Sequence, residues 1–316
     1  MNLKKTTIRT SIIFALLLSL NIYSAYGRSD SDGAGDSDAK RGKVFGIVLS
    51  GGGALGYAHI GVLHAFEEEG FNPQYVAGAS MGAVIAAFYS NGMTALDIMK
   101  MARDEKFYKT SKIISITVGL DKLGMSSHKH VSALLDKYIP HNSFDSLERK
   151  LYVSVTNLNT QRSEIISEGD RLKEYVLASS SIPGVFEAID IDGIVYVDGG
   201  VLNNFPAQAI RNKCDVLIGV DVQPYSPTMK LNNVIDVSLR SLYTLVNVNS
   251  LEGRGLCDYL IDSYAINDYT IFDFNKIEEI YQYGYNLGKK YLQEHPELLE
   301  WIRQEQSYSS SSSIER

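Results

Sequence analysis

Short apolar runs alternate with segments of helical apolar spacing along residues 44–305. The run Val44–Leu49 is continuous, rich in β-branched residues and followed by Ser50 and three glycines, which predicts a buried parallel strand. In Ala54–Glu69, apolar residues recur three or four positions apart before Gly70, and this spacing predicts a helix that ends at the glycine. Because strands and helices alternate, we expect one α/β domain with a mainly parallel sheet and helices on both faces.

The same patterns locate the remaining elements of this domain. Short apolar runs predict strands, and longer periodic segments predict helices. A mixed, mainly helical stretch is expected at Thr94–Tyr138. We expect further strands at Tyr75–Ala77, Leu151–Thr156, Ser163–Ile166, Ile194–Val197 and Val216–Val220, and further helices at Ala83–Tyr89, Pro206–Arg211 and Lys276–Gln293.

Residues 1–27 have the pattern of a secretory signal peptide. Lys4 and Lys5 give a positive start, and the apolar run Ser11–Leu20 is too short to span a bilayer comfortably. Ala25-Tyr26-Gly27 supplies small residues where a signal peptidase needs them. We therefore expect export, to a periplasm or out of the cell, with a short N-terminal membrane anchor as the alternative.

Two polar segments flank the domain at residues 44–305. Residues 28–43 contain almost no side chain that could be buried, and residues 306–316 are rich in serine. Neither segment can offset the entropy of ordering its backbone. We expect a flexible leader at 28–43 and a disordered tail at 306–316.

Charge and cysteine content exclude several classes of partner. The net charge of −7 argues against nucleic acid, which requires a basic footprint. It also disfavours electrostatic docking on anionic lipid, while an insoluble or zwitterionic substrate stays open. Cys214 and Cys257 are too few for a disulfide scaffold, and the sequence does not decide whether they pair. No Cys/His cluster has metal-ligand spacing, so neither a metal nor another cofactor is expected, and nothing in the sequence indicates an oligomeric state.

The first candidate for chemistry is the segment Gly78-Ala79-Ser80-Met81-Gly82. It fits the pattern G-x-S-x-G between a predicted strand and a predicted helix, where the chain turns sharply and leaves the serine strained and exposed. The start of the helix also brings backbone N–H groups close to the serine. Taken alone, the pattern fits a simple small-residue turn as well as a nucleophile.

The second candidate is the glycine loop Gly51-Gly52-Gly53-Ala54-Leu55-Gly56. Consecutive glycines between a strand and a helix expose backbone N–H groups, as an oxyanion hole requires. Gly51, Gly53 and Gly56 also fit G-x-G-x-x-G, but a dinucleotide site would need an acidic residue about 20 positions further on. The second strand instead leads into Ser80. We therefore favour a hydrolase, with backbone donors from Gly51, Gly52, Gly53 and Met81.

The third candidate is Asp198-Gly199-Gly200, which follows the predicted strand Ile194–Val197. An acid at the carboxyl end of a strand lies where active sites form in open α/β sheets, although D-G is also a strong turn signal. Asn203 and Asn204 are candidates for bracing this loop. Ser179–Ser181 lack flanking glycines and are expected to be capping or turn residues.

These three motifs, in this order and spacing, resemble the patatin-like phospholipase family. Further stretches carry the resemblance: His59–Leu63 after the glycine loop, Ser181–Gly184 before Asp198, and Asn203–Pro206 after it. The resemblance covers about Lys43–Val222. It implies a dyad of Ser80 and Asp198, without histidine or metal, that hydrolyses acyl esters of a lipid or membrane-interface substrate, as a phospholipase A or lysophospholipase does. The motif glycines that support the dyad are Gly56, Gly78, Gly82, Gly199 and Gly200.

The chain departs from the family's pattern at Leu55, where the family often has Arg or Lys. That side chain is credited with supporting the oxyanion loop or a phosphate group. Its replacement leaves the backbone donors in place and puts the preference for a phospholipid head group in question.

A Ser-Asp-His triad is the main alternative to the dyad. In α/β-hydrolases the histidine follows the acid in the chain, and only His295 follows Asp198. Its charged, helix-ending surroundings favour a solvated position. We expect surface or packing positions for the other histidines, His59, His64, His128, His130 and His141.

Two other functions and one local question stay open. The chain could be a carboxylesterase or thioesterase for soluble esters, or a catalytically silent lipid-binding module. The segment Phe107–Met125 mixes apolar residues with Lys and Ser, which fits a cap that touches lipid or a packed surface excursion. Head group, acyl position and chain length are not determined by the sequence.

Overall fold

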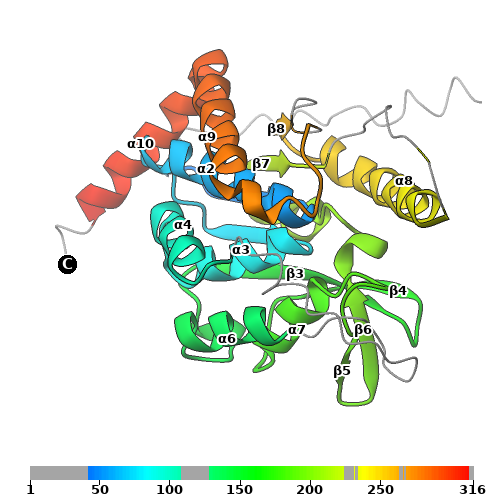
Figure 1. Ribbon diagram of the computed structural model, residues 1–316. Coiled ribbons are helices and arrows are strands. Elements are labelled where there is room, and N and C mark those ends of the chain that lie inside the picture. Colours follow the sequence, from blue (N-terminus) through cyan, green and yellow to red (C-terminus); the bar gives the residue numbers. More distant parts are fainter. Residues whose placement is uncertain are drawn as a thin grey trace, which may run out of the picture. The chain divides into compact units, whose positions relative to one another are not determined.

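Eight strands in the described part of the chain form one mixed sheet (Figure 1). The computed structural model describes residues 42–107, 128–223, 231, 234–262, 266 and 268–312. Across the sheet the order is β5-β6-β3-β2-β1-β7-β8, and β4 also pairs with β3. The strands are β1 (Phe45–Leu49), β2 (Tyr75–Gly78), β3 (Lys150–Asn157), β4 (Arg162–Ile166), β5 (Ile189–Ile191), β6 (Ile194–Asp198), β7 (Val216–Asp221) and β8 (Tyr259–Asp262).

The central strands are parallel, as the apolar runs predict. β3, β2, β1, β7 and β8 all run in the same direction, while β4, β5 and β6 add antiparallel pairs at one side. β1 has neighbours on both edges, and all its residues are buried. A strand covered on both faces is apolar throughout. The predicted α/β class with a mainly parallel sheet is therefore confirmed.

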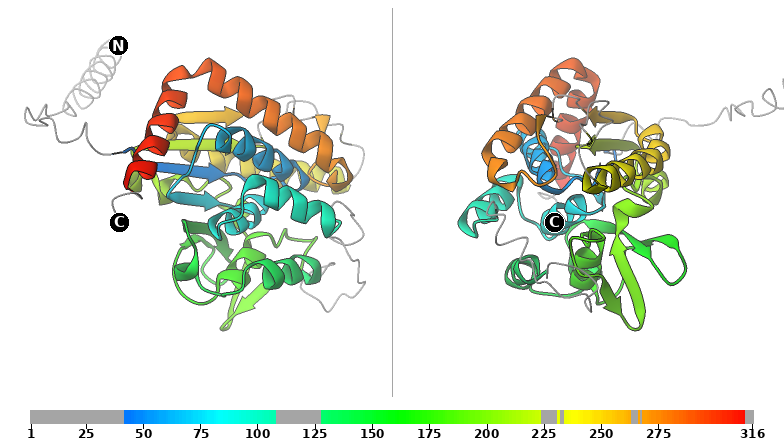
Figure 2. Two further views of the ribbon diagram at one scale, coloured as in Figure 1. Left: turned by 90° about the vertical axis from the view of Figure 1, so that its left-hand side faces the viewer. Right: turned by 45° about the vertical axis from the view of Figure 1, so that its right-hand side comes forward.

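Two cores of unequal size lie on the faces of the sheet. Ile47 and Leu49 of β1 belong to the larger core and Val48 to the smaller one, as the two-residue period of a strand requires. The smaller core lies under 3-10 turns at Ala207–Ala209 and Arg211–Lys213. The other helices contribute buried residues to the larger core, against which Tyr243 of α8 also packs, and α9 lies along α2 (Figure 2). The helices are α2 (Tyr57–Glu67), α3 (Met81–Ser90), α4 (Ala95–Asp104), α6 (Lys129–Tyr138), α7 (Leu172–Ser179), α8 (Val234–Gly255), α9 (Ile277–Glu294) and α10 (Pro296–Ser312).

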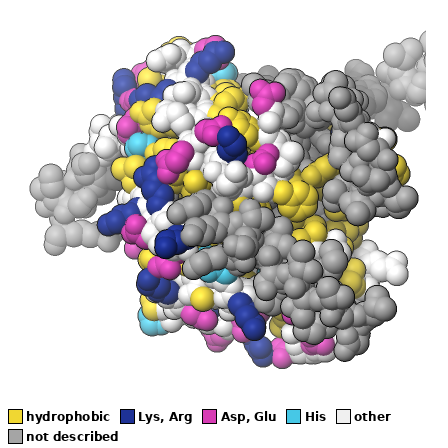
Figure 3. Space-filling model, viewed as in Figure 1, with side chains coloured by type: hydrophobic (Ala, Val, Ile, Leu, Met, Phe, Trp, Pro, Cys, Tyr) yellow, Lys and Arg dark blue, Asp and Glu magenta, His cyan; other side chains and the backbone are white. Residues whose placement is uncertain are grey.

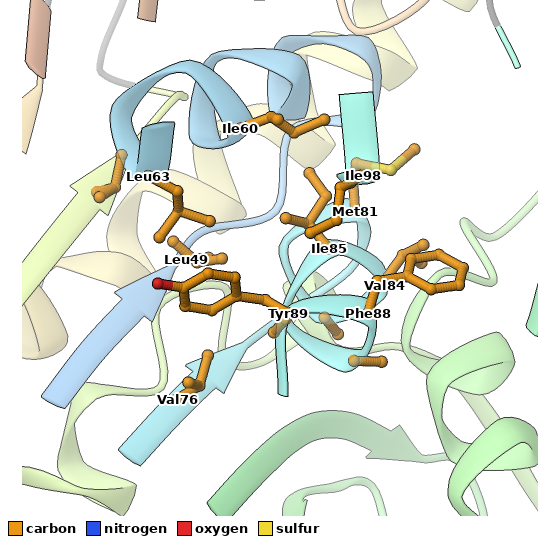
Figure 4. Packing of buried hydrophobic residues seen from close by; sticks show 14 of the residues in the cluster. Leu49, Ile60, Leu63, Val76, Met81, Val84, Ile85, Phe88, Tyr89 and Ile98 are labelled. Carbon is orange, nitrogen blue, oxygen red and sulfur yellow. The ribbon is translucent and has the colours of Figure 1, made fainter. Parts of the chain in front are cut away.

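The larger core anchors α3, the helix that follows β2. Leu49, Leu63, Ile85 and Tyr89 are almost fully buried and come together from β1, α2 and α3 (Figure 4). A fully buried side chain of this size stabilises the fold by about 1.5–3 kcal/mol. The turn between β2 and α3 is therefore held at both ends by packed elements.

Two local predictions are wrong. The helix expected at Pro206–Arg211 is a pair of 3-10 turns, because the fully buried Ile210 between them leaves the α-helical region, with a φ of −125° and a ψ of −4°. The disordered tail expected at 306–316 is helical as far as Ser312. Leu298 and Ile302 anchor α10 in the core, and a helix that is already nucleated extends at little cost.

Several predictions fall on residues outside those described. These are the signal peptide at 1–27, the leader except for its last two residues, and the segment after Phe107 with its proposed cap. Within the described ranges, no helix is long and apolar enough to cross a membrane. Cys214 and Cys257 are both free thiols.

Candidate active site

Ser80 and Asp198 meet because β2 and β6 share one edge of β3. Val153 of β3 pairs with both β2 and β4, and Val155 pairs with both β4 and β6. β4 therefore occupies one edge of β3, and β2 and β6 follow one another along the opposite edge. Since β6 is antiparallel to β3, its last residue comes toward the end of β2. Ser80 Oγ donates a hydrogen bond of 2.7 Å to Asp198 Oδ2.

The turn after β2 holds Ser80 in a strained conformation. Its φ is 53° and its ψ is −129°, a region that non-glycine residues rarely adopt and that costs on the order of 1–3 kcal/mol. The Ser80 N–H donates to Ser179 Oγ at 3.0 Å, and Ser179 Oγ–H donates to the Ser154 carbonyl of β3 at 2.7 Å. The hydroxyl of Ser179 therefore ties the turn to the sheet. Sequence reasoning treated this serine as a capping or turn residue and missed this role.

The second glycine of the turn is required by a close approach of backbones. A Cβ on Gly82 would lie 2.3 Å from the Leu49 carbonyl oxygen and 2.4 Å from that of Ser50. No side chain fits at these distances, so α3 can start directly beside the end of β1 only with glycine there.

Asp198 is held by four hydrogen bonds in a buried environment. Besides the bond from Ser80, the Asp198 Oδ1 accepts the Gly200 N–H at 2.7 Å and the Asp198 N–H donates to the Ser181 carbonyl at 3.0 Å. The Asp198 carbonyl accepts from Thr156 Oγ1 at 2.9 Å. The residue is only 5% exposed. Burial raises the pKa of the carboxyl to about 7, although the hydrogen bonds from Ser80 and Gly200 act in the opposite direction. Near neutral pH, both the acid and the carboxylate form are populated.

The glycine loop places backbone donors beside this pair. Gly53 has a φ of +54°, and a Cβ there would lie 2.4 Å from the Ile271 carbonyl oxygen, so glycine is required at this position. Gly52 and Gly53 line a pocket together with Ser80 and Asp198. Among the described residues, no acceptor lies within hydrogen-bond range of the N–H groups of Gly52 and Gly53. These amides are free to bind an anion.

The other two predicted donors are placed differently. The Gly51 N–H points to the Asn204 carbonyl at 3.3 Å, which removes it from the set of available donors. Met81 is the first residue of α3, so its N–H has no partner within the helix. Neither residue lines the pocket. Gly52 and Gly53 are therefore the donors that the pocket presents directly.

The remaining motif glycines lie at close contacts around the pair. A Cβ on Gly199 would lie 2.2 Å from the Ser154 carbonyl oxygen, one on Gly78 would lie 2.7 Å from the backbone of Gly82, and one on Gly56 would lie 2.4 Å from Met81 Cγ. At each of these three positions a side chain would collide with a neighbouring segment or residue.

A sequence profile described as "Patatin-like phospholipase" matches residues 47–210 of the chain. The chain belongs to the patatin-like phospholipase family. The match contains all three motifs and confirms the resemblance, and it classes the chain with lipid acyl ester hydrolases.

Several curated relatives of this patatin-like chain are named lysophospholipases. The chain is 26% identical over 284 residues to the lysophospholipase NTE1 of Saccharomyces cerevisiae, covering 80% of this chain and 17% of the yeast protein. It is also 26% identical over 282 residues to the lysophospholipase nte1 of Emericella nidulans, covering 80% of this chain and 18% of that protein. The aligned region thus spans less than a fifth of these relatives.

Among solved structures, VipD from Legionella pneumophila matches with a TM-score of 0.46 at 16% identity, over 81% of this chain and 67% of that chain. ExoU of Pseudomonas aeruginosa, in its complex with SpcU, matches with a TM-score of 0.39 at 13% identity, over 80% of this chain and 52% of that chain.

The histidines of the patatin-like domain do not contact Ser80 or Asp198 in the described structure. His295 lies at the end of α9, with Nδ1 at 2.9 Å from the Tyr291 carbonyl oxygen and its ring stacked on Tyr291. His59 is fully buried and its Nε2 lies 2.8 Å from the Ser50 carbonyl oxygen. Burial lowers the pKa of His59 to about 4, so the ring is neutral near pH 7. It donates to the backbone just before the glycine loop, a packing role as expected.

α8, which sequence reasoning missed, covers the site. Leu242, Tyr243 and Val246 on its inner face line the pocket. Its Asn249 accepts the Asn204 N–H at 2.9 Å and donates to the carbonyls of Gly200 and Val201 at 2.9 and 3.1 Å. The helix is thereby tied to the loop that carries Asp198.

None of the described residues that line the pocket has a cationic side chain. The only ionisable groups among its lining residues are Asp198 and Tyr243. Leu55 is 4% exposed and belongs to the larger core, so this residue contributes packing only. Within the described ranges, no group of His, Cys, Asp and Glu side chains could hold a metal ion.

Proposed function

We propose that the chain hydrolyses acyl esters of phospholipids or related lipids, with Ser80 as nucleophile and Asp198 as base. The observation that carries this proposal is the 2.7 Å hydrogen bond between Ser80 Oγ and a carboxylate whose pKa lies at about 7. A base is most effective when its pKa lies near the working pH. An exposed aspartate would be a much weaker base.

In the proposed reaction, Asp198 accepts the proton of Ser80 Oγ as the oxygen attacks the ester carbonyl. The tetrahedral intermediate places its oxyanion at the N–H groups of Gly52 and Gly53, with Met81 as a further donor. Removal of one such donor typically costs about 3–4 kcal/mol of transition-state stabilisation. The alcohol product leaves with the proton from Asp198. A water molecule, deprotonated by Asp198, then attacks the acyl-serine. The bond to Ser80 Oγ breaks as the fatty acid is released, and Asp198 returns the proton to Ser80 Oγ.

The lining of the pocket supports an apolar acyl group as the part of the substrate bound there. Ile182, Pro183, Val201, Leu242, Val246 and Ile271 supply apolar walls. The named relatives are lysophospholipases, and we propose the same type of activity here. Because the described lining residues offer no cation for a phosphate, we expect the head group to lie outside the pocket.

Fatty-acid release tests this function. The protein is mixed with vesicles of lysophosphatidylcholine and phosphatidylcholine, and Ser80→Ala, Asp198→Ala and Ser180→Ala are assayed alongside it. Ser180 neighbours the site, but within the described part of the chain its hydroxyl bonds only to the Leu177 carbonyl, so it is the matched control. We expect release to fall at least about a thousandfold in the first two variants and to persist in the third.

Other outcomes separate the alternatives. Cleavage of a soluble short-chain ester through Ser80, without vesicle hydrolysis, would replace the lipid hydrolase with a carboxylesterase. A folded parent protein that turns over neither substrate would exclude the proposed function and leave a lipid-binding module.

We also propose that residues 1–27 direct export. The positive start and the short apolar run of the sequence support this. N-terminal sequencing of the protein recovered from its cells is expected to begin at Arg28. An N-terminus at Met1 or Asn2 would overturn the proposal.

A further inference from the structure

We propose that the outer face of α8 rests on the surface of a zwitterionic lipid aggregate and brings the pocket to its substrate; this rests on the lipid hydrolase function proposed above. α8 is the helix at the right of Figure 1. The inner face of α8 lies on the pocket, because Leu242, Tyr243 and Val246 line it. The proposal concerns the outer face of the helix.

Four large apolar side chains stand exposed along the outer face of α8. Val237 is 50% exposed, Leu245 58%, Val248 63% and Leu251 61%. At 3.6 residues per turn they lie within an arc of about 120°, opposite the pocket-lining residues. We call these four residues the outer stripe. They are four of the nine large apolar side chains that stand exposed in the described ranges, and such clustering on one helix face marks an interaction site.

Exposed apolar side chains also stand next to pocket residues in the chain. Leu245 precedes the pocket residue Val246 in the chain, and Leu202, 40% exposed, follows the pocket residue Val201. Figure 3 shows hydrophobic side chains to the right of its centre, on the side where Figure 1 places α8, while charged side chains of both signs cover the left. A lipid that left a surface in contact with the outer stripe would have an apolar path to Ser80.

The charge of the outer face fits a surface without net charge. Residues 241–251 contain no Asp, Glu, Lys or Arg, and one charge of each sign, Arg240 and Glu252, flanks them. Binding to anionic membranes relies on clustered Lys and Arg, which are not present here. Binding through the outer stripe therefore depends on burial of apolar area and not on electrostatic attraction. The partner is a zwitterionic lipid surface.

The hydroxyl groups on this face are already satisfied within the helix. Ser241 Oγ donates to the Val237 carbonyl at 2.8 Å, and Thr244 Oγ1 donates to the Arg240 carbonyl at 2.9 Å. Polar groups whose hydrogen bonds are formed internally lose less on transfer out of water. The outer face can therefore enter the boundary between head groups and acyl chains, where interfacial helices bind.

The test replaces the outer stripe without touching the pocket. In the full chain, Leu245, Val248 and Leu251 are changed together to serine. Binding to phosphatidylcholine vesicles is measured by flotation, and hydrogen exchange of the peptide spanning residues 241–251 is measured with and without vesicles. We expect binding through this face to weaken roughly a hundredfold. Turnover of a soluble short-chain ester should stay within about twofold of the parent value.

The matched control replaces the same number of exposed large apolar side chains elsewhere. Leu96, Leu158 and Ile194, which are 51%, 46% and 36% exposed, are changed together to serine. Leu96 belongs to α4, which lies on the opposite side of the molecule from α8 in Figure 1. We expect this variant to bind vesicles like the parent. All the proteins share residues 1–27, so the protection of residues 241–251 by vesicles reports on α8 alone.

Each outcome decides the proposal. Vesicles that leave hydrogen exchange at 241–251 unchanged, equal weakening in the control, or binding only when anionic phosphatidylglycerol is added would overturn it. Loss of vesicle binding and of lipid hydrolysis in the stripe variant, with ester turnover retained, would support it. If the parent cleaves no ester at all, the proposed function fails, and protection of residues 241–251 still decides whether α8 contacts lipid.

Discussion

The burial of Asp198 predicts a measurable loss of stability as the carboxyl ionises. Its pKa is raised from 3.8 to about 7, chiefly by burial. Between these values the folded protein holds a proton that the unfolded chain has released, so stability falls as the pH rises from about 4 to about 7. With 1.36 kcal/mol for each pKa unit, the loss is about 4 kcal/mol by pH 8.

Asp198→Asn removes this loss without changing the shape of the residue. The amide oxygen can still accept the Gly200 N–H, and the side chain can still form a hydrogen bond with Ser80 Oγ. We therefore expect the variant to gain stability relative to the parent as the pH rises, by about 4 kcal/mol between pH 4 and pH 8. Both proteins would be unfolded with urea at several pH values and followed by circular dichroism, with free energies of unfolding compared at each pH.

A control separates this effect from a general effect of removing negative charge. Asp104 is exposed at the end of α4, and Asp104→Asn is taken through the same series. A stability difference between Asp198→Asn and the parent that stays constant from pH 4 to pH 8 would refute the reasoning. It would mean that the carboxyl titrates as an exposed one does and is a poor base near neutral pH.

Four further predictions concern activity and the supports of the site. The value of kcat/KM for a soluble ester should rise with pH through a midpoint at about 7 as Asp198 ionises, and a midpoint near 4 would exclude it as the base. Ser179→Ala removes the acceptor of the Ser80 N–H and should cost about 1–3 kcal/mol in urea unfolding, with a larger fall in kcat than in KM. Asn249→Ala removes three hydrogen bonds to the loop after Asp198 and should cost about 2–3 kcal/mol; unchanged stability would show that α8 is not tied there. Gly82→Ala forces a methyl group within 2.3 Å of a carbonyl oxygen and should destabilise the fold by at least about 3 kcal/mol, or prevent recovery of folded protein.

The strands and the three motifs could be predicted because their signals are local. Val44–Leu49 and Val216–Val220 are apolar throughout, and the strands β1 and β7 agree with them to within one residue at each end. In the turn after β2, Gly78 reflects a contact with Gly82 in the same turn, whereas Gly82 reflects the approach of the end of β1; the strand–G-x-S-x-G–helix pattern itself is local. Wherever neighbours in the chain decide the conformation, the sequence pattern was sufficient.

The meeting of Ser80 with Asp198 could not be derived from local pattern. The two residues are 118 positions apart, and their contact depends on β2 and β6 sharing one edge of β3. The sequence offers no sign of this pairing, and only the resemblance to a family supplied it. The contribution of Ser179 was missed for the same reason, since its hydroxyl acts between elements distant in sequence.

α8 escaped prediction because it is apolar on both sides. One side lines the pocket and the other side carries the outer stripe. Its apolar residues therefore do not fall on the one face that identifies an amphipathic helix. The alternating Val246-Asn247-Val248-Asn249 even resembles a strand. A helix of this kind is recognised only when its two partners, the pocket and the surface that we propose for it, are both considered.

The central claim is that Asp198 activates Ser80. The most direct measurement exposes the folded protein to a fluorophosphonate that reacts only with activated serines, and locates the adduct by mass spectrometry. We predict one adduct, on the peptide containing Ser80, formed at least about a hundredfold more slowly in Asp198→Asn. An adduct on a different residue, or equal rates in the parent and in Asp198→Asn, would contradict the claim.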